Sequence, residues 1–135
     1  MSAYDLHNNI DARIAFDIQD LTNQNTVAGE IIDTSGFQSI EYVIQSGSIT
    51  MGIAIPILEE SDNPLMPEGT ETTLVPASEI LGEITDMNVF KATKIGSIGK
   101  KRYQRLLVKT DAGIGVGPKL SATAILGNPN FSPIA

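Results

Sequence analysis

Few residues of this chain have the types and spacing that catalysis or metal binding requires. His7 is the only histidine and cysteine is absent, so converging His and Cys side chains cannot build a zinc site or an activated nucleophile. Paired carboxylates for glycoside hydrolysis would need aromatic side chains along a sugar cleft, and the chain has four Phe, three Tyr and no Trp. The sequence therefore predicts a protein that is not an enzyme, with no catalytic residue, cofactor or metal site.

Two segments have a superficial similarity to ligand-binding loops. The stretch Glu59–Asn63 is rich in oxygen ligands, but it lacks the glycine that an EF-hand needs at its sixth position, so a solvated acidic loop is the better interpretation. The stretch Gly113–Pro118 is rich in glycine, but a β-like run follows it, where a dinucleotide-binding fingerprint would open a helix. A hairpin loop explains this segment better than a phosphate site.

Charge is distributed very unevenly along the chain. Residues 1–90 contain Arg13 as their one basic residue and fifteen Asp and Glu, a formal charge of −14, whereas residues 91–135 contain eight basic residues and one Asp, a formal charge of +7. The overall pI near 4.5 argues against nonspecific binding of nucleic acid. The split instead favours contact with a charged protein, or pairing of the two regions within one chain.

The strongest candidates for partner contact are a basic edge and an acidic loop. The basic edge comprises Lys100, Lys101, Arg102 and Arg105, beside the turn at Gly99, and the acidic loop, from 59 to 76, contributes Glu59, Glu60 and Asp62. In an extended strand these cations alternate between two faces. They either meet an acidic protein surface, or they pair with Glu and Asp of a neighbouring strand of the same chain.

The elements that position these residues are predicted to be strands. Runs rich in Val, Ile, Thr and Tyr, bounded by turn residues, indicate strands at about 28–33, 39–45, 49–58, 79–84, 89–95, 101–110 and 119–126. Gln45–Ser48 is predicted to form a hairpin, and Pro56 predicts a sheet edge or a bulge. The fold class is all-β, a β-sandwich or jelly-roll of about seven to eight antiparallel strands, occupying residues 26–135.

The first twenty-five residues fit two interpretations. Ile14, Phe16 and Ile18 alternate as in a strand, and the turn-prone residues 23–25 follow them. We expect residues 1–25 to be an extended N-terminal arm whose three apolar residues reach a neighbouring subunit; the alternative is a first strand or short helix of the same core. The N-terminus has no signal-peptide pattern, and no stretch approaches the ~20 apolar residues of a membrane span.

Several phrases of the sequence resemble small virion proteins of tailed bacteriophages. They are Leu58–Asp62, Ile80–Gly82, Lys94–Arg105, Ala124–Pro129 and Ser132–Pro133. The chain resembles the head decoration, or capsid cement, type from about residue 37 to residue 133. The resemblance implies a module that binds and stabilises an assembled shell of the HK97-like type. It implies the major capsid protein as partner, a homo-oligomer (dimer or trimer), and a place on the capsid exterior after synthesis in the bacterial cytoplasm.

A second function is compatible with the same fold. The module would then bind a surface glycan, or a neck or tail component of the virion. A hydrolase is the least favoured interpretation, because the residues carry no enzyme signature. Neither nucleic acid nor a membrane is expected as a partner.

Overall fold

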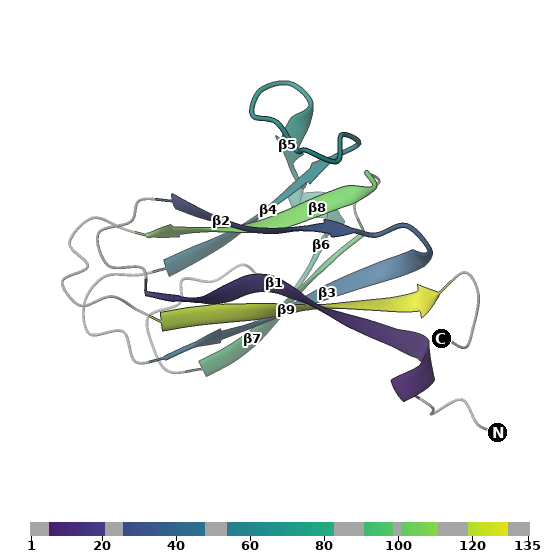
Figure 1. Ribbon diagram of the computed structural model, residues 1–135, viewed down its shortest axis with the longest axis horizontal. Helices are drawn as coiled ribbons and strands as arrows, with labels where there is room; N and C mark the ends of the chain where they lie inside the picture. The colour runs from purple at the N-terminus through teal and green to yellow at the C-terminus, as the bar shows by residue number, and fades with distance from the viewer. Residues whose placement is uncertain are drawn as a thin grey trace.

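Two antiparallel β-sheets lie face to face in the computed structural model (Figure 1). The structure describes residues 6–20, 26–47, 54–82, 91–98, 101–110 and 119–129. One sheet has five strands in the order β1-β9-β3-β7-β6, and the other has four in the order β2-β8-β4-β5. The predicted all-β sandwich is therefore confirmed.

The elements follow one another along the described chain as strands, with two short 3-10 helices. They are η1 (His7–Asn9), β1 (Ile10–Asp20), β2 (Thr26–Asp33), β3 (Phe37–Ser46), β4 (Ala54–Ser61), β5 (Thr72–Leu74), η2 (Ala77–Glu79), β6 (Ile80–Leu81), β7 (Lys91–Ser97), β8 (Tyr103–Thr110) and β9 (Lys119–Pro129). The seven predicted strand regions all contain observed strands, and the structure adds β1 and β5.

The core forms between the sheets because side chains alternate along each strand. In β9, Ala122, Ala124 and Leu126 are buried, and Leu106 and Val108 of β8 approach from the other sheet. Aliphatic side chains of this kind supply most of the apolar area that folding removes from water.

One polar bridge crosses this core. The Tyr42 hydroxyl on β3 donates to Oε1 of Gln104 on β8 at 3.3 Å, and Nε2 of Gln104 donates to Oγ of Ser97 on β7 at 3.2 Å. All three residues are buried. Burial also raises the pKa of the Tyr42 phenol, since the charged form would lose its hydration. The two sheets are thus held in register by hydrogen bonds as well as by apolar contact.

The expected N-terminal arm is wrong for residues 10–20, which form strand β1 of the five-stranded sheet. β1 pairs with β9 from Ile10 opposite Gly127 to Asp20 opposite Lys119. Its alternation is broken by a register shift near Ile14, after which Phe16 is only 1% exposed. Burial of that ring between the sheets stabilises the strand inside the sandwich, so residues 10–20 belong to the body of the fold.

A close approach between β1 and β2 requires a glycine. A Cβ atom added to Gly29 would collide with the Ala15 carbonyl oxygen and lie 2.8 Å from that of Leu106. β2 also shifts register against β8 between Ala28 and Ile31. This irregularity and the missing side chain let β1 and β2 approach each other closely across the sandwich.

Two turn predictions had different outcomes. Gln45–Ser48 does not make a hairpin between neighbouring strands, because β3 and β4 belong to different sheets. β3 pairs with β9 instead, and the Gly47 amide donates to the Lys119 carbonyl at 2.8 Å. Pro56 does lie at a sheet edge: β8 flanks it on one side, and β5 pairs with β4 only from residue 59 onward. The glycine-rich segment 113–118 lies outside the described residues.

Candidate interaction surface

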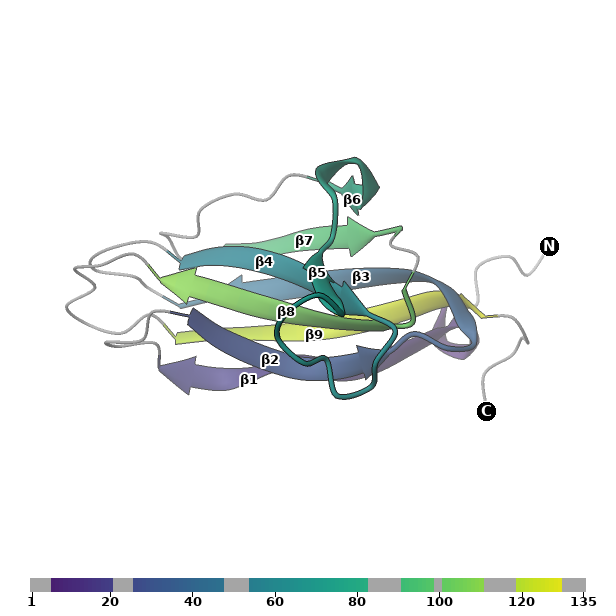
Figure 2. The same cartoon turned by 90° about the horizontal axis from the view of Figure 1, so that it is seen from above.

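The predicted basic and acidic segments lie beside each other in the four-stranded sheet. Lys101 and Arg102 precede β8, and Arg105 is within it, while Glu59 and Glu60 are in the last part of β4. β4 and β8 are antiparallel neighbours, so the end of β4 meets the beginning of β8 (Figure 2). The fold thus interleaves the two charged regions at one end of the sandwich.

The central ion pair of this surface joins Arg105 to Glu59. The two residues are direct partners in the β4–β8 register, and Nη2 of the guanidinium lies 2.7 Å from Oε2 of the carboxylate. Their side chains are only 15% and 20% exposed. A cross-strand pair at this distance satisfies both charges within the chain.

Arg102 pairs with Asp33 at the end of β2. Nε and Nη2 of Arg102 each donate to a carboxylate oxygen of Asp33 at 2.9 Å, a two-point contact. The guanidinium holds the pKa of Asp33 below its usual value, an effect that partial burial opposes. The same guanidinium lies 5.1 Å from the centre of the Tyr103 ring, within reach of a cation–π contact. Arg102 therefore contacts both the end of β2 and Tyr103, the first residue of β8.

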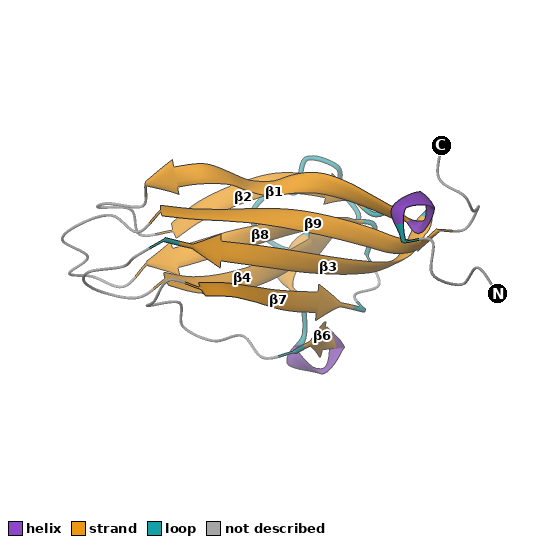
Figure 3. Cartoon of the chain, turned by 90° about the horizontal axis from the view of Figure 1, so that it is seen from below, coloured by secondary structure: helices purple, strands orange, loops and turns teal. Residues whose placement is uncertain are grey.

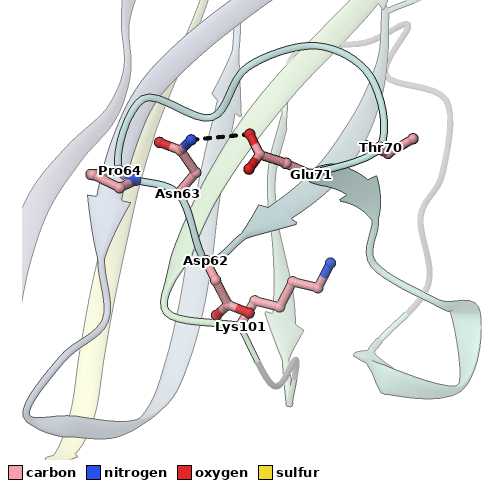
Figure 4. A pocket seen from close by; sticks show the side chains of 6 residues that line it. All are labelled: Asp62, Asn63, Pro64, Thr70, Glu71 and Lys101. Atoms are coloured by element: carbon pink, nitrogen blue, oxygen red, sulfur yellow. Dashed lines mark hydrogen bonds between the residues drawn. The ribbon is translucent and has the colours of Figure 1, made fainter.

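Lys101 borders an open hollow beside the acidic loop (Figure 4). Its Nζ donates to Oγ1 of Thr73 at 3.2 Å, and across the hollow Nδ2 of Asn63 donates to Oε2 of Glu71 at 3.1 Å. The hollow encloses about 540 Å³ and is lined by Asp62, Asn63, Pro64, Thr70, Glu71 and Lys101. It is shallow and polar, and a lysine ammonium at its rim disfavours a bound cation.

The loop from 62 to 71 is ordered by its own hydrogen bonds. Oδ1 of Asn63 accepts the Leu65 amide at 2.9 Å, and the Asn63 carbonyl accepts the Met66 amide at 3.0 Å. Met66 has a φ of 43°, which is rare for a residue other than glycine. Its side chain is buried, at 2% exposed. The loop rises on the outer side of the four-stranded sheet (Figure 1) and passes over β8 and β2 in the view from above (Figure 2).

Two predicted contact residues are wrong as surface groups. Glu60 is 5% exposed. Burial alternates along β4, so the Glu60 side chain points toward the inside of the sandwich, while Glu59 points outward. Phe16 is in the core, as described above. Ile14, in contrast, is 64% exposed, and Asp62 is exposed, with Oδ1 accepting the Arg102 amide at 3.3 Å. Lys100 and the side chain of Ile18 lie outside the described residues.

Within the described ranges, no cluster of three or more His, Cys, Asp and Glu side chains is arranged to hold a metal ion. His7 lies in the exposed helix η1. No helix in this part of the chain is long and apolar enough to cross a membrane.

Some residues that pair with the cations lie outside the acidic loop, and they were not predicted from the sequence. Asp33 is the main example: it binds Arg102, its Oδ1 accepts the Ser35 amide at 3.0 Å, and its carbonyl accepts Nη1 of Arg13 at 2.6 Å. The signal that was available is the Asp-Thr-Ser-Gly turn, in which an Asp commonly accepts the amide two residues on.

Comparison with known proteins identifies a fold and no family. No family model matches the chain, and no curated protein matches it. Among solved structures, the chain is similar to a chain of "Structure of infectious bursal disease virus Gx strain", with a TM-score of 0.50 and 12% identity. The match covers 90% of this chain and 34% of the viral chain, so this chain spans about a third of that protein's length. At this identity the similarity concerns the sandwich fold alone.

Proposed function

We propose that this chain is a structural protein of a bacteriophage virion that binds and stabilises the assembled shell from the outside. The observation that carries the proposal is the two-sheet sandwich, which aligns over 90% of the chain with a chain from a virus structure. The decoration-type phrases in the sequence support the same role, since most of them fall on the strands and turns of this sandwich.

The stabilisation follows from mass action. A protein that binds the assembled shell and not the free capsid subunits lowers the free energy of the shell by an amount that grows with its concentration. The partner is the major capsid protein of an HK97-like shell, and the protein works as a small homo-oligomer on the capsid exterior. It is not an enzyme in this proposal, and it is made in the cytoplasm of the bacterial host.

The charged surface supports a protein partner over nucleic acid. Arg102 and Arg105 already pair with Asp33 and Glu59, so they are not free to displace counterions from a phosphate backbone. Because these cations are paired within the chain, the basic edge stabilises the end of the sandwich. It contacts a partner through the groups that stay exposed.

Co-sedimentation tests the proposal. Purified protein is mixed with expanded empty shells and, separately, with unassembled major capsid protein of the phage that encodes it. We expect saturable binding to the shells at micromolar concentration and none to the free subunits. No co-sedimentation with shells would refute a decoration role, and binding to purified necks or tails instead would favour the alternative virion component.

A further inference from the structure

The outer face of the five-stranded sheet carries a group of apolar side chains among polar ones. The register and the alternation of burial place Ala12 and Ile14 of β1, Ile125 of β9, Val43 of β3 and Ala92 of β7 on this face, beside polar side chains such as Ser121, Thr123 and Gln45. An antiparallel sheet with one face in water normally places polar side chains there. Here Ile14 is 64% exposed, and Leu81 at the β6 edge is 49% exposed. Large apolar side chains exposed on one face of a sheet mark a candidate interaction site.

The two faces of the sandwich differ in what covers them. The loop from 62 to 71 passes over the outer side of the four-stranded sheet and buries Met66. On the other side, Figure 3 shows β1, β9, β3 and β7 side by side, with η1 at one end of the strands and no described segment crossing their middle. The five-stranded sheet therefore offers a broad face that the described chain leaves uncovered.

This face has a protruding side chain on one edge and a hollow on the other. Ile14 projects from β1, and a shallow hollow of about 450 Å³ lies beside β7, lined by Val43, Ala92, Thr93 and Lys94. The register places Ile14, Thr123, Val43 and Lys94 in one row across the sheet. A twofold axis parallel to the strands would place β1 of one copy over β7 of the other, in the same row.

We propose that this face is a self-association surface, on which Ile14 of each copy enters the Val43–Lys94 hollow of a second copy. The two sheets would pack with their strands aligned, as in other sheet-on-sheet contacts. Such an isologous contact satisfies both copies at once and closes without forming a filament.

Charge and area are compatible with a second copy as the occupant. The chain carries a net charge of −7, yet the outer face carries charges of both signs, including Glu41, Lys94 and Lys119, so like charges do not dominate it. Four strands about 4.8 Å apart and seven residues of about 3.4 Å each cover roughly 500 Å² per copy. A pair would bury about 1,000 Å², the lower limit of a specific interface. The dimer should therefore be concentration-dependent.

Sedimentation equilibrium of the full chain tests this inference, with and without a charge swap. We expect a monomer–dimer equilibrium between about 1 and 100 µM. Ile14→Lys should weaken association at least tenfold, because its ammonium would face Lys94 of the second copy. The double variant Ile14→Lys with Lys94→Glu should restore it. Three strand spacings, about 14 Å, separate the two residues within one chain, so the rescue acts between chains.

Thr26→Lys, on an exposed position of the four-stranded sheet, is the matched control and should associate like the unmodified protein. Ala92→Glu is a second variant of the hollow, and circular dichroism verifies folding of each. A monomer at every concentration, or a double variant as weak as Ile14→Lys, would overturn the inference. Self-association is measured without the shell, so its outcome does not depend on whether the protein binds the shell. If the protein is monomeric and Ile14→Lys abolishes shell binding, the face contacts the shell and the self-association proposal is wrong.

Discussion

Arg105 on β8 lies directly opposite Glu59 on β4, with Nη2 and Oε2 2.7 Å apart and both side chains at most one-fifth exposed. The sequence places them in regions of opposite charge 46 residues apart. Their contact shows that the uneven charge distribution is neutralised, in part, inside one subunit. The charged surface therefore stabilises the fold of the subunit itself.

Removing Glu59 should therefore destabilise the fold. Glu59→Ala leaves the largely buried Arg105 side chain without its carboxylate, and we expect a loss of about 1–3 kcal/mol in the free energy of unfolding. Urea denaturation measures the loss. Glu68→Ala, an exposed residue of the same acidic loop, is the control and should change stability by less than about 0.5 kcal/mol. Equal effects of the two variants would contradict the importance of the pair.

Gly29→Ala should be considerably more damaging than an ordinary glycine substitution. The added methyl group would meet the backbone carbonyls of Ala15 on β1 and Leu106 on β8, which cannot move without parting β2 from the facing sheet or from its neighbour β8. We expect a loss of about 1–3 kcal/mol from overpacking. Gly47→Ala is the matched control, because its Cβ would lie 3.6 Å from the Lys119 carbonyl, an ordinary contact. A thermal melt that ranks Gly47→Ala as the worse variant would refute the account of the β1–β2 side.

The Asp33–Arg102 pair predicts a pH dependence with a definite sign. The folded-state pKa of Asp33 lies below its ordinary value of 3.8, so the pair contributes stability that is present above that value and lost as pH falls through the lower folded-state pKa. Asp33→Asn should therefore differ from the unmodified protein at neutral pH, and the difference should shrink below about pH 4. Melting temperatures across this range measure it. Because both side chains are substantially exposed, the effect should be small. A difference that grows toward acid pH would contradict the assignment.

The buried bridge predicts unequal effects for its members. Gln104→Ala removes the partner of both the Tyr42 hydroxyl and the Ser97 hydroxyl, and we expect a loss of about 2–4 kcal/mol from the unsatisfied groups and the cavity. Tyr42→Phe removes one hydroxyl from one end of the bridge, and it should cost about 1 kcal/mol. Chemical denaturation of both variants gives the comparison. If Tyr42→Phe proves as costly as Gln104→Ala, Gln104 does not link the two hydroxyls.

The fold class was predictable because strand periodicity is a local property. Alternation in regions such as 101–110 and 119–126 identifies strands and their inward faces, and Tyr103–Val108 alternates as expected. What each strand pairs with is not local. Gln45–Ser48 contains turn residues, but the strands on either side of it belong to different sheets. Phe16 lies in the core because β1 pairs with β9 and becomes the edge strand of the five-stranded sheet.

The candidate surface was predictable in its residues and less so in its contacts. The pairing of Arg105 with a carboxylate of a neighbouring strand was one of two alternatives that the sequence left open, and the structure shows Glu59 as that partner. Glu60 follows Glu59 directly, and the period of two places it on the other side of the strand. Asp33 escaped prediction because it is 69 residues from Arg102 in the chain.

The most direct test of the shell-stabilising role is the thermal stability of purified expanded shells, measured by light scattering with and without saturating protein. The account predicts that disruption of the shells moves to a higher temperature, by an amount that increases with the free protein concentration as mass action requires. Shells that bind the protein to saturation and yet break down at an unchanged temperature would contradict it.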